Sequence, residues 1–429
     1  MLVVPIAAGT ILGLVAYCYI LADDRRWLLV AIFSHVLLFV HSSSGGNSAV
    51  TPIALTDILF SVVFFPGLAL WFFRRIRSRD KIVEGWADVV VFVFLVYAFL
   101  SIGLAAYQGF SVEKGIREFL LFVPLLLIFP VRREAKKNKG AQLIVWTLLL
   151  TSVTVGLVIV VRYKLDLMAA HYLWQVISNR QQKEESLYMS SIIILLAFLV
   201  GNKYSKTLNL FLIGIELFSL AITFSRGYWI TTFLGVVAST FFMRGKARKR
   251  LLALMVGGGL LSAAVAFLLL PHIFGSLITG IIERAGSISP DALTIRSRLV
   301  ESEAALGKFV RNPVIGYGMG ALFTFYNILT NESLRTWYIH NAYVFLLFKF
   351  GIVGFIMFLS MYFKRVSELW ELWKRKLETP DNSFVTALLL IPLMMLFISG
   401  TSPQFFDRGS LMILAIVWGI GESMLEGAA

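Results

Sequence analysis

Apolar runs long enough to cross a bilayer recur along this whole 429-residue sequence. A helix needs about 20 mainly apolar residues to cross roughly 30 Å of hydrocarbon, and there the backbone must satisfy its own hydrogen bonds. The alternating strands of a membrane β-barrel are absent. The chain is also 58% hydrophobic and 15% charged, whereas soluble domains are about 45–50% apolar and about 25% charged. The sequence therefore predicts an all-α integral membrane protein.

The apolar runs predict about 12 (12–13) transmembrane helices. The count depends on the N-terminal end, because the second segment is short for a crossing. We expect the first segment to be retained as a span, because no basic residues precede it and no cleavage site follows it. The expected segments are 2–21, 27–41, 52–73, 87–107, 116–131, 142–162, 187–201, 208–224, 228–243, 251–270, 340–363, 384–399 and 410–424.

The formal net charge of +14 is carried largely by Lys and Arg clusters between the apolar runs. Such clusters mark the cytoplasmic side and contact anionic membrane lipid, so no nucleic-acid partner is expected. The clusters lie at 25–26, 74–81, 132–139, 203–206, 244–250 and 364–376. This topology predicts three parts: transmembrane helices with short loops over 1–270, one large outward-facing loop over 271–339, and C-terminal transmembrane helices over 340–429.

The large loop is expected to contain an amphipathic helix that starts at Ser289-Pro290 and stops before Asn312-Pro313. Its apolar stripe places Arg296 in the contact with the membrane domain, while Arg298 and Glu301 point to the opposite, polar face. The stretch 312–320 (NPVIGYGMG) follows, with three glycines at alternate positions. A tight structural turn is the default interpretation, and a phosphate-binding loop is the alternative.

Three arginines on the outward side are candidates for binding a doubly charged anion such as a pyrophosphate. Arg226, in the turn Ser225-Arg226-Gly227, presents five fixed donors that match phosphate geometry, although it could instead snorkel to lipid headgroups. Arg296 could instead form an ion pair with Glu303. Arg180 could be a solvated loop arginine.

His340 opens a late segment, in Tyr338-Ile339-His340-Asn341. An imidazole at the outer boundary can accept a proton from a hydroxyl, with Tyr338 and Asn341 as possible supporting residues, although a lone interfacial His is often only an anchor. The other histidines show no metal-ligand spacing, and Cys18 is the single cysteine. No acidic metal motif and no phosphate-binding loop for ATP is present, so no metal and no cofactor is expected.

These motifs resemble those of the O-antigen ligase and O-antigen polymerase superfamily of bacterial envelopes. The resemblance rests on Ser225-Arg226-Gly227, on Arg296 ahead of the glycine stretch, and on His340-Asn341-Ala342-Tyr343 followed by the sequence FGIVG at 350–354. It covers roughly residues 180–360, while the N-terminal segments resemble the family only in hydropathy.

The resemblance implies a GT-C-like glycosyltransferase of the bacterial inner membrane with its site facing the periplasm. The donor would be a glycan on undecaprenyl pyrophosphate, held by Arg226, Arg296 and Arg180, and His340 would be the base for the acceptor hydroxyl. The acceptor would be lipid A–core for a ligase, which we favour, or a second lipid-linked glycan for a polymerase. A transporter or flippase of a lipid-linked or anionic substrate is the alternative from another class, but no internal repeat supports it.

Overall fold

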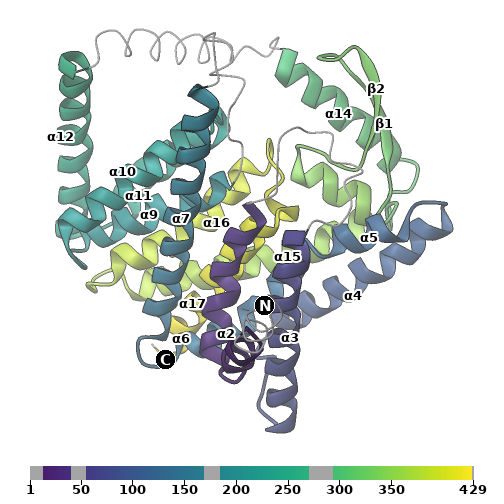
Figure 1. Ribbon diagram of the computed structural model, residues 1–429, viewed down its shortest axis with the longest axis horizontal. Helices are drawn as coiled ribbons and strands as arrows, with labels where there is room; N and C mark the ends of the chain where they lie inside the picture. Colours follow the sequence, from purple (N-terminus) through teal and green to yellow (C-terminus); the bar gives the residue numbers. More distant parts are fainter. Residues whose placement is uncertain (1–12, 40–54, 169–183, 270–292, 428–429) are drawn as a thin grey trace, which may run out of the picture.

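The computed structural model describes residues 13–39, 55–168, 184–269 and 293–427, which are mostly helical (Figure 1). The α-helices are α2 (Asp24–Phe33), α3 (Leu55–Arg77), α4 (Trp86–Tyr107), α5 (Val112–Phe119), α6 (Ile128–Ala135), α7 (Gly140–Met168), α9 (Glu185–Val200), α10 (Lys206–Ile222), α11 (Arg226–Phe242), α12 (Gly245–Leu269), α14 (Leu293–Phe309), α15 (Ala342–Arg375), α16 (Asn382–Ile398) and α17 (Arg408–Glu426). The 3-10 helices are η1 (Ser34–Phe39), η3 (Val123–Leu127) and η4 (Gln404–Phe406), and the strands are β1 (Phe323–Asn327) and β2 (Glu332–Thr336).

Five helices of the described residues are long and apolar enough to cross a membrane. They lie at Ile58–Arg77, Trp86–Tyr107, Gly140–Leu165, Ala342–Arg375 and Arg408–Glu426. The apolar helices α9 and α16 are shorter. The helical membrane class therefore agrees with the sequence, whereas about 12 crossings remains a prediction.

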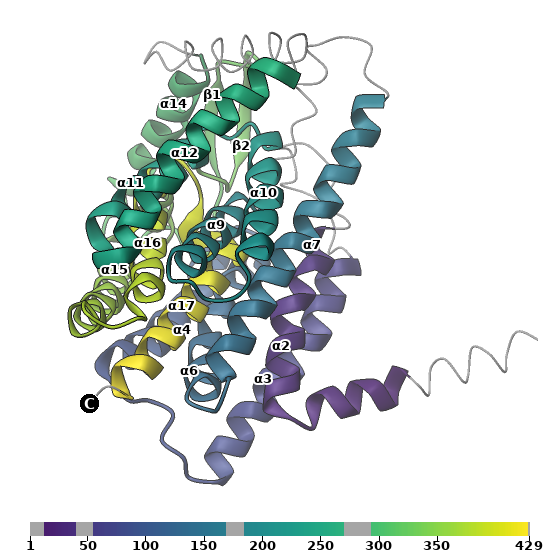
Figure 2. The ribbon, with the colours of Figure 1, turned by 90° about the vertical axis from the view of Figure 1, so that its left-hand side faces the viewer.

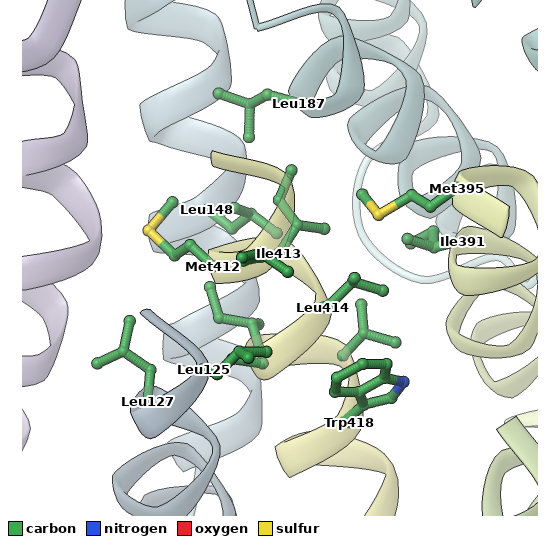
Figure 3. Packing of buried hydrophobic residues seen from close by; sticks show 14 of the residues in the cluster. Leu125, Leu127, Leu148, Leu187, Ile391, Met395, Met412, Ile413, Leu414 and Trp418 are labelled. Carbon is green, nitrogen blue, oxygen red and sulfur yellow. The ribbon is translucent and has the colours of Figure 1, made fainter. Parts of the chain in front are cut away.

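Helix α17 lies at the centre of the bundle and is buried on every side from Gly409 to Gly421. It packs against η3, α6, α9, α15 and α16. Figure 3 shows Met412, Ile413, Leu414 and Trp418 of α17 among apolar side chains of η3, α7, α9 and α16. A helix that is buried on all faces is stable only when other helices surround it, so α17 forms part of the core of the bundle.

Helix α14 and the β1–β2 hairpin lie together at one end of the bundle, far from the C-terminus (Figures 1 and 2). We call this the α14 end. The opposite end is tied by buried ion pairs: Asp88 of α4 accepts a hydrogen bond from Arg132 of α6 at 2.9 Å and another from Arg365 of α15, and Glu422 of α17 accepts one from Arg132 at 3.1 Å. These pairs neutralise part of two predicted basic clusters.

Two predicted spans are wrong in detail. The expected span 116–131 is three short helices, α5, η3 and α6. Ser111 caps the first of them by accepting from Lys114 N, and Pro124 stands at the start of η3, where a proline interrupts a longer α-helix. The expected span 27–41 ends as an α-helix at Phe33, and the 3-10 helix η1 follows.

The hairpin was not predicted, because the sequence suggested only helices in the large loop. Strands β1 and β2 pair antiparallel from Phe323↔Thr336 to Asn327↔Glu332. In β1, Phe323 and Phe325 are buried while Thr324 and Tyr326 are exposed. This alternation is the mark of a half-buried strand, and its buried side packs against α14.

The glycine stretch is a structural turn, as the default interpretation predicted. Gly316, Gly318 and Gly320 have φ of +68°, +82° and +91°, a region that glycine adopts without strain. Their neighbours bond to α15 where that helix is broken at Gly351 (φ +62°). The bonds are Tyr317 N to Phe348 O at 2.9 Å, Gly318 N to Lys349 O at 2.8 Å and Ile352 N to Pro313 O at 2.8 Å.

A buried ion pair holds the end of the same stretch. Lys349 Nζ of α15 lies 2.6 Å from Glu118 Oε2 of α5, and Gly320 N donates to the same oxygen at 2.9 Å. Lys349 also donates to Ala321 O at 2.7 Å. The backbone of residues 313–321, between α14 and His340, is thus fastened to α5 and α15.

Candidate functional site

His340 and Glu301 form a hydrogen-bonded pair at the α14 end. The His340 backbone N–H donates to Glu301 Oε1 at 2.7 Å, and the ring Nδ1 lies 2.8 Å from Glu301 Oε2. Glu301 is 4% exposed, whereas the His340 side chain is 35% exposed. A carboxylate at this position accepts a hydrogen bond from the Nδ1–H of the ring. It therefore fixes the orientation of the ring and leaves Nε2 as the proton acceptor. The pair can act as an oriented general base.

The two residues meet because α14 and the segment before α15 are each held in place. Asn341 caps α15, and its side chain accepts from Tyr343 N at 3.0 Å and from Val344 N at 3.2 Å. Such a cap fixes where the helix begins. Helix α14 packs against both β1 and α15. His340 therefore lies just before the capped start of α15, directly beside Glu301.

Tyr338 backs the histidine. Its ring lies 4.9 Å from the His340 ring at an interplanar angle of 87°, and it also contacts Phe406 of η4. Burial, and then the Glu301 carboxylate, raise the pKa of Tyr338 well above its ordinary value. Tyr338 is therefore a neutral phenol that supports the imidazole and does not compete with it as a base.

The turn after α16, residues 399–404, joins the start of α15 to two arginine-bearing segments. Ala342 N donates to Ser399 O at 2.9 Å. Arg298 Nη1 of α14 donates to Thr401 O at 3.2 Å. Tyr228 Oη of α11 lies 3.0 Å from Ser402 Oγ. Three segments far apart in the sequence meet at this turn.

Arg226 stands at the first position of α11, beside the same turn. It is partly exposed. The next residue, Gly227, packs so closely that a Cβ there would lie 2.8 Å from Ile398 Cδ1 and 3.6 Å from Thr401 Oγ1. A larger residue there would push the end of the Ile398 side chain aside. The Ser225-Arg226-Gly227 motif thus docks on the turn that also holds Arg298 and the start of α15.

The predicted orientation of α14 is wrong. Arg296 is exposed, and so are Leu293, Leu299 and Val310 of the expected buried stripe. The buried residues are Ser297, Glu301 and Ala305, one helical turn apart from each other. The small side chains of Ser297 and Ala305 let α14 approach its neighbours. The cost of burying the Glu301 carboxylate is offset by two hydrogen bonds with His340. Apolar content alone therefore gave the wrong face.

One further candidate, Glu303, does not contact the pair in the described residues. Glu303 is exposed on α14, and no ion pair between Glu303 and Arg296 is present in the described residues. Arg180 lies outside the described residues. The acidic group that contacts His340 is Glu301, and the arginine of α14 that reaches the turn is Arg298.

The fold and the site together define a class of protein. It is a helical membrane protein with a histidine–carboxylate pair and arginines at one end of its bundle. Residues 208–359 match the family model described as O-Antigen ligase. This match confirms the resemblance to the O-antigen ligase and polymerase superfamily. No curated protein matches the chain. The matched region includes the Arg226 turn, α14 and His340.

Proposed function

We propose that the chain is a glycosyltransferase that moves a glycan from undecaprenyl pyrophosphate to an acceptor hydroxyl at the periplasmic face of the bacterial inner membrane. We favour an O-antigen ligase, with lipid A–core as the acceptor. The observation that carries the proposal is the His340–Glu301 pair, with Nδ1 2.8 Å from the carboxylate, beside the turn that contacts Arg298 and the α11 start.

In the proposed step, His340 Nε2 takes the proton of the acceptor hydroxyl while the oxygen attacks C1 of the donor sugar. The C1–O bond to the pyrophosphate breaks, its electron pair leaves with the pyrophosphate, and the anomeric centre inverts. General-base help of this kind contributes about 10²–10⁴-fold. Glu301 stabilises the imidazolium that forms, as the carboxylate of a hydrolase triad does.

Arginines neutralise the leaving pyrophosphate. Arg226 keeps the role expected from its motif. Arg298 takes the role first assigned to Arg296, because both side chains are exposed but only the Arg298 guanidinium contacts the turn in the described residues. Preorganised cations placed where negative charge develops stabilise the transition state of such steps. The step uses the histidine as base and the arginines as positive charge, so it requires neither a metal nor a nucleotide.

The reaction is tested with purified protein, an undecaprenyl-pyrophosphate-linked glycan and a hydroxyl acceptor. We expect His340→Ala and Glu301→Gln to lower kcat by about 10²-fold or more, with a smaller change in the KM for the donor. Both variants must keep the wild-type yield and thermal stability. A His340→Ala protein with near-normal transfer would refute the assigned base. Movement of the lipid-linked substrate without a new glycosidic bond would indicate a transporter.

Ligase and polymerase are distinguished by envelope glycans from a strain that lacks the gene. Loss of a ligase leaves lipid-linked polymer that is not attached to lipid A–core. Loss of a polymerase leaves single repeats attached. We expect the first pattern, seen by gel electrophoresis of the lipopolysaccharide.

A further inference from the structure

A buried amide lies at the end of the turn after α16, where η4 begins. Gln404 opens η4 and is 1% exposed. Its Nε2 donates to Tyr228 Oη and, at 3.2 Å, to Ser402 Oγ. Its Oε1 accepts from Ser410 Oγ at 2.7 Å. One side chain therefore connects the first turn of α11, the turn after α16 and the first turn of α17.

The partners of this amide lie next to both arginines of the site. Tyr228 follows Arg226 by two residues in the first turn of α11. Ser402 follows Thr401, whose carbonyl holds Arg298 at 3.2 Å. A shift of the Gln404 amide would therefore move the Arg226 turn relative to the anchor of Arg298.

Gln404 is too deeply buried to contact a substrate itself, so any effect on the reaction passes through its neighbours. In the described residues, the Tyr228 hydroxyl has two hydrogen-bond partners, Gln404 and Ser402. Buried polar groups that lose a partner are costly and rearrange. Binding of an anion by two guanidinium groups depends on their separation, because each makes directional hydrogen bonds.

We propose that Gln404 is a positioning residue that sets the separation of the Arg226 and Arg298 guanidinium groups, and thereby the affinity for the donor pyrophosphate. The inference rests on the proposed function, since it takes the pyrophosphate as the ligand of both arginines. It assigns Gln404 no part in proton transfer, because the His340–Glu301 pair does not contact it.

The test compares Gln404→Met with a matched control, Asn209→Leu. Asn209 is also a fully buried amide, with its Nδ2 donating to Lys203 O at 3.0 Å. It lies in the first turn of α10, at the other end of that helix from the Arg226 turn. Both changes remove a buried amide and should lower thermal stability, but only one lies beside the arginines.

Affinity is measured with glycan-free undecaprenyl pyrophosphate in detergent, and KM and kcat are measured in the transfer assay. We expect Gln404→Met to weaken binding by about tenfold and to raise the KM for the donor by a similar factor. Its kcat should fall by no more than the KM rises, because the arginines also neutralise the leaving group, and it should keep the wild-type pH profile. Asn209→Leu should bind within about twofold of the wild type despite its lower thermal stability.

Tyr228→Phe removes the acceptor of the Gln404 hydrogen bond and keeps the aromatic ring. It replaces Gln404→Met in the binding test if Gln404→Met does not fold. The double variant should bind about as weakly as the weaker single variant, because the two changes break one interaction. Wild-type affinity in both single variants, additive losses in the double variant, or a fall in kcat with unchanged KM would overturn the inference. A wild-type protein that does not bind undecaprenyl pyrophosphate would overturn the proposed function as well.

Discussion

At the scale of single residues, the site depends on which arginine of α14 faces the turn after α16. Arg296 and Arg298 are both exposed, but Arg298 donates to Thr401 O at 3.2 Å. We expect Arg298→Ala to raise the KM for the lipid-linked donor by about tenfold or more, since a charge-assisted contact to phosphate is worth roughly 1.5–3 kcal/mol. Arg296→Ala should change KM by less than about twofold, as surface substitutions do.

The two variants control for each other, because both remove one positive charge from the same helix. Donor KM and kcat measured for the pair give the answer. A larger effect of Arg296→Ala than of Arg298→Ala would restore the assignment made from the apolar stripe.

Asp407 provides a pH-dependent test of the packing beside Gln404. Its side chain caps α17 by accepting from Ser410 N at 2.8 Å. Burial, and then the Glu184 carboxylate, raise the pKa of Asp407 from 3.8 to about 6, while Ser410 and His35 oppose the rise. The folded protein therefore keeps this proton at pH values where the unfolded chain has lost it. This contribution to stability falls as pH rises from about 4 to about 6 and stays low above that range.

Asp407→Asn keeps a capping oxygen but cannot ionise. We expect its Tm relative to the wild type to rise by a few degrees between about pH 4 and about pH 7, because only the wild type loses stability across that window. Thermal unfolding in detergent at a series of pH values measures this difference. A difference that stays constant, or that falls with pH, would show that the carboxyl of Asp407 titrates elsewhere.

At the scale of elements, the break in α15 and the glycine turn hold the large loop in place. A Cβ at Gly351 would lie 2.3 Å from Val314 O, and the residue has φ of +62°. We expect Gly351→Ala to destabilise the protein by about 2 kcal/mol or more, because it combines a backbone clash with an unfavourable φ. Gly214→Ala, in α10 with nothing within 4 Å of the new Cβ, should be neutral or stabilising by up to about 1 kcal/mol. Equal Tm values for the two variants would contradict this account of the turn.

Most helices at this scale could be predicted from hydropathy, with ends within a few residues: the expected span 87–107 is α4, Trp86–Tyr107. Elements that depend on distant contacts could not. The segment 116–131 is apolar enough for one span, yet it is divided at Pro124, and Glu118 in it pairs with Lys349 from a helix more than two hundred residues away. Sequence alone does not contain that pairing.

At the scale of the whole molecule, the placement of α14 outside the cell membrane is a prediction from the basic clusters. The chain has one cysteine, Cys18, so a Cys18→Ser background permits single-cysteine labelling. We expect Glu303→Cys on α14 to react with a membrane-impermeant thiol reagent once the outer membrane is permeabilised, and Ser78→Cys after α3 to react only after lysis. Both positions are exposed. The reverse labelling would invert the topology and the proposed site.

The site could be predicted in part, for reasons that also belong to this scale. Arg226 and His340 were identifiable because each stands in a short motif at the end of an apolar run. Glu301 and Arg298 were not. Hydropathy predicts that the apolar side of α14 is buried, whereas the face that is buried is the one on which Glu301 pairs with His340. Gln404 lies in a turn with no motif, and only the three-dimensional contacts reveal it.

The central claim is that one pyrophosphate sits among the guanidinium groups and the imidazole at the α14 end. A structure of the protein with bound undecaprenyl pyrophosphate tests it most directly. We predict phosphate oxygens within about 3 Å of the guanidinium nitrogens of Arg226 and Arg298, with His340 Nε2 facing the terminal phosphate, where the glycan is attached. Pyrophosphate bound away from these residues, or at the opposite end of the bundle, would contradict the account.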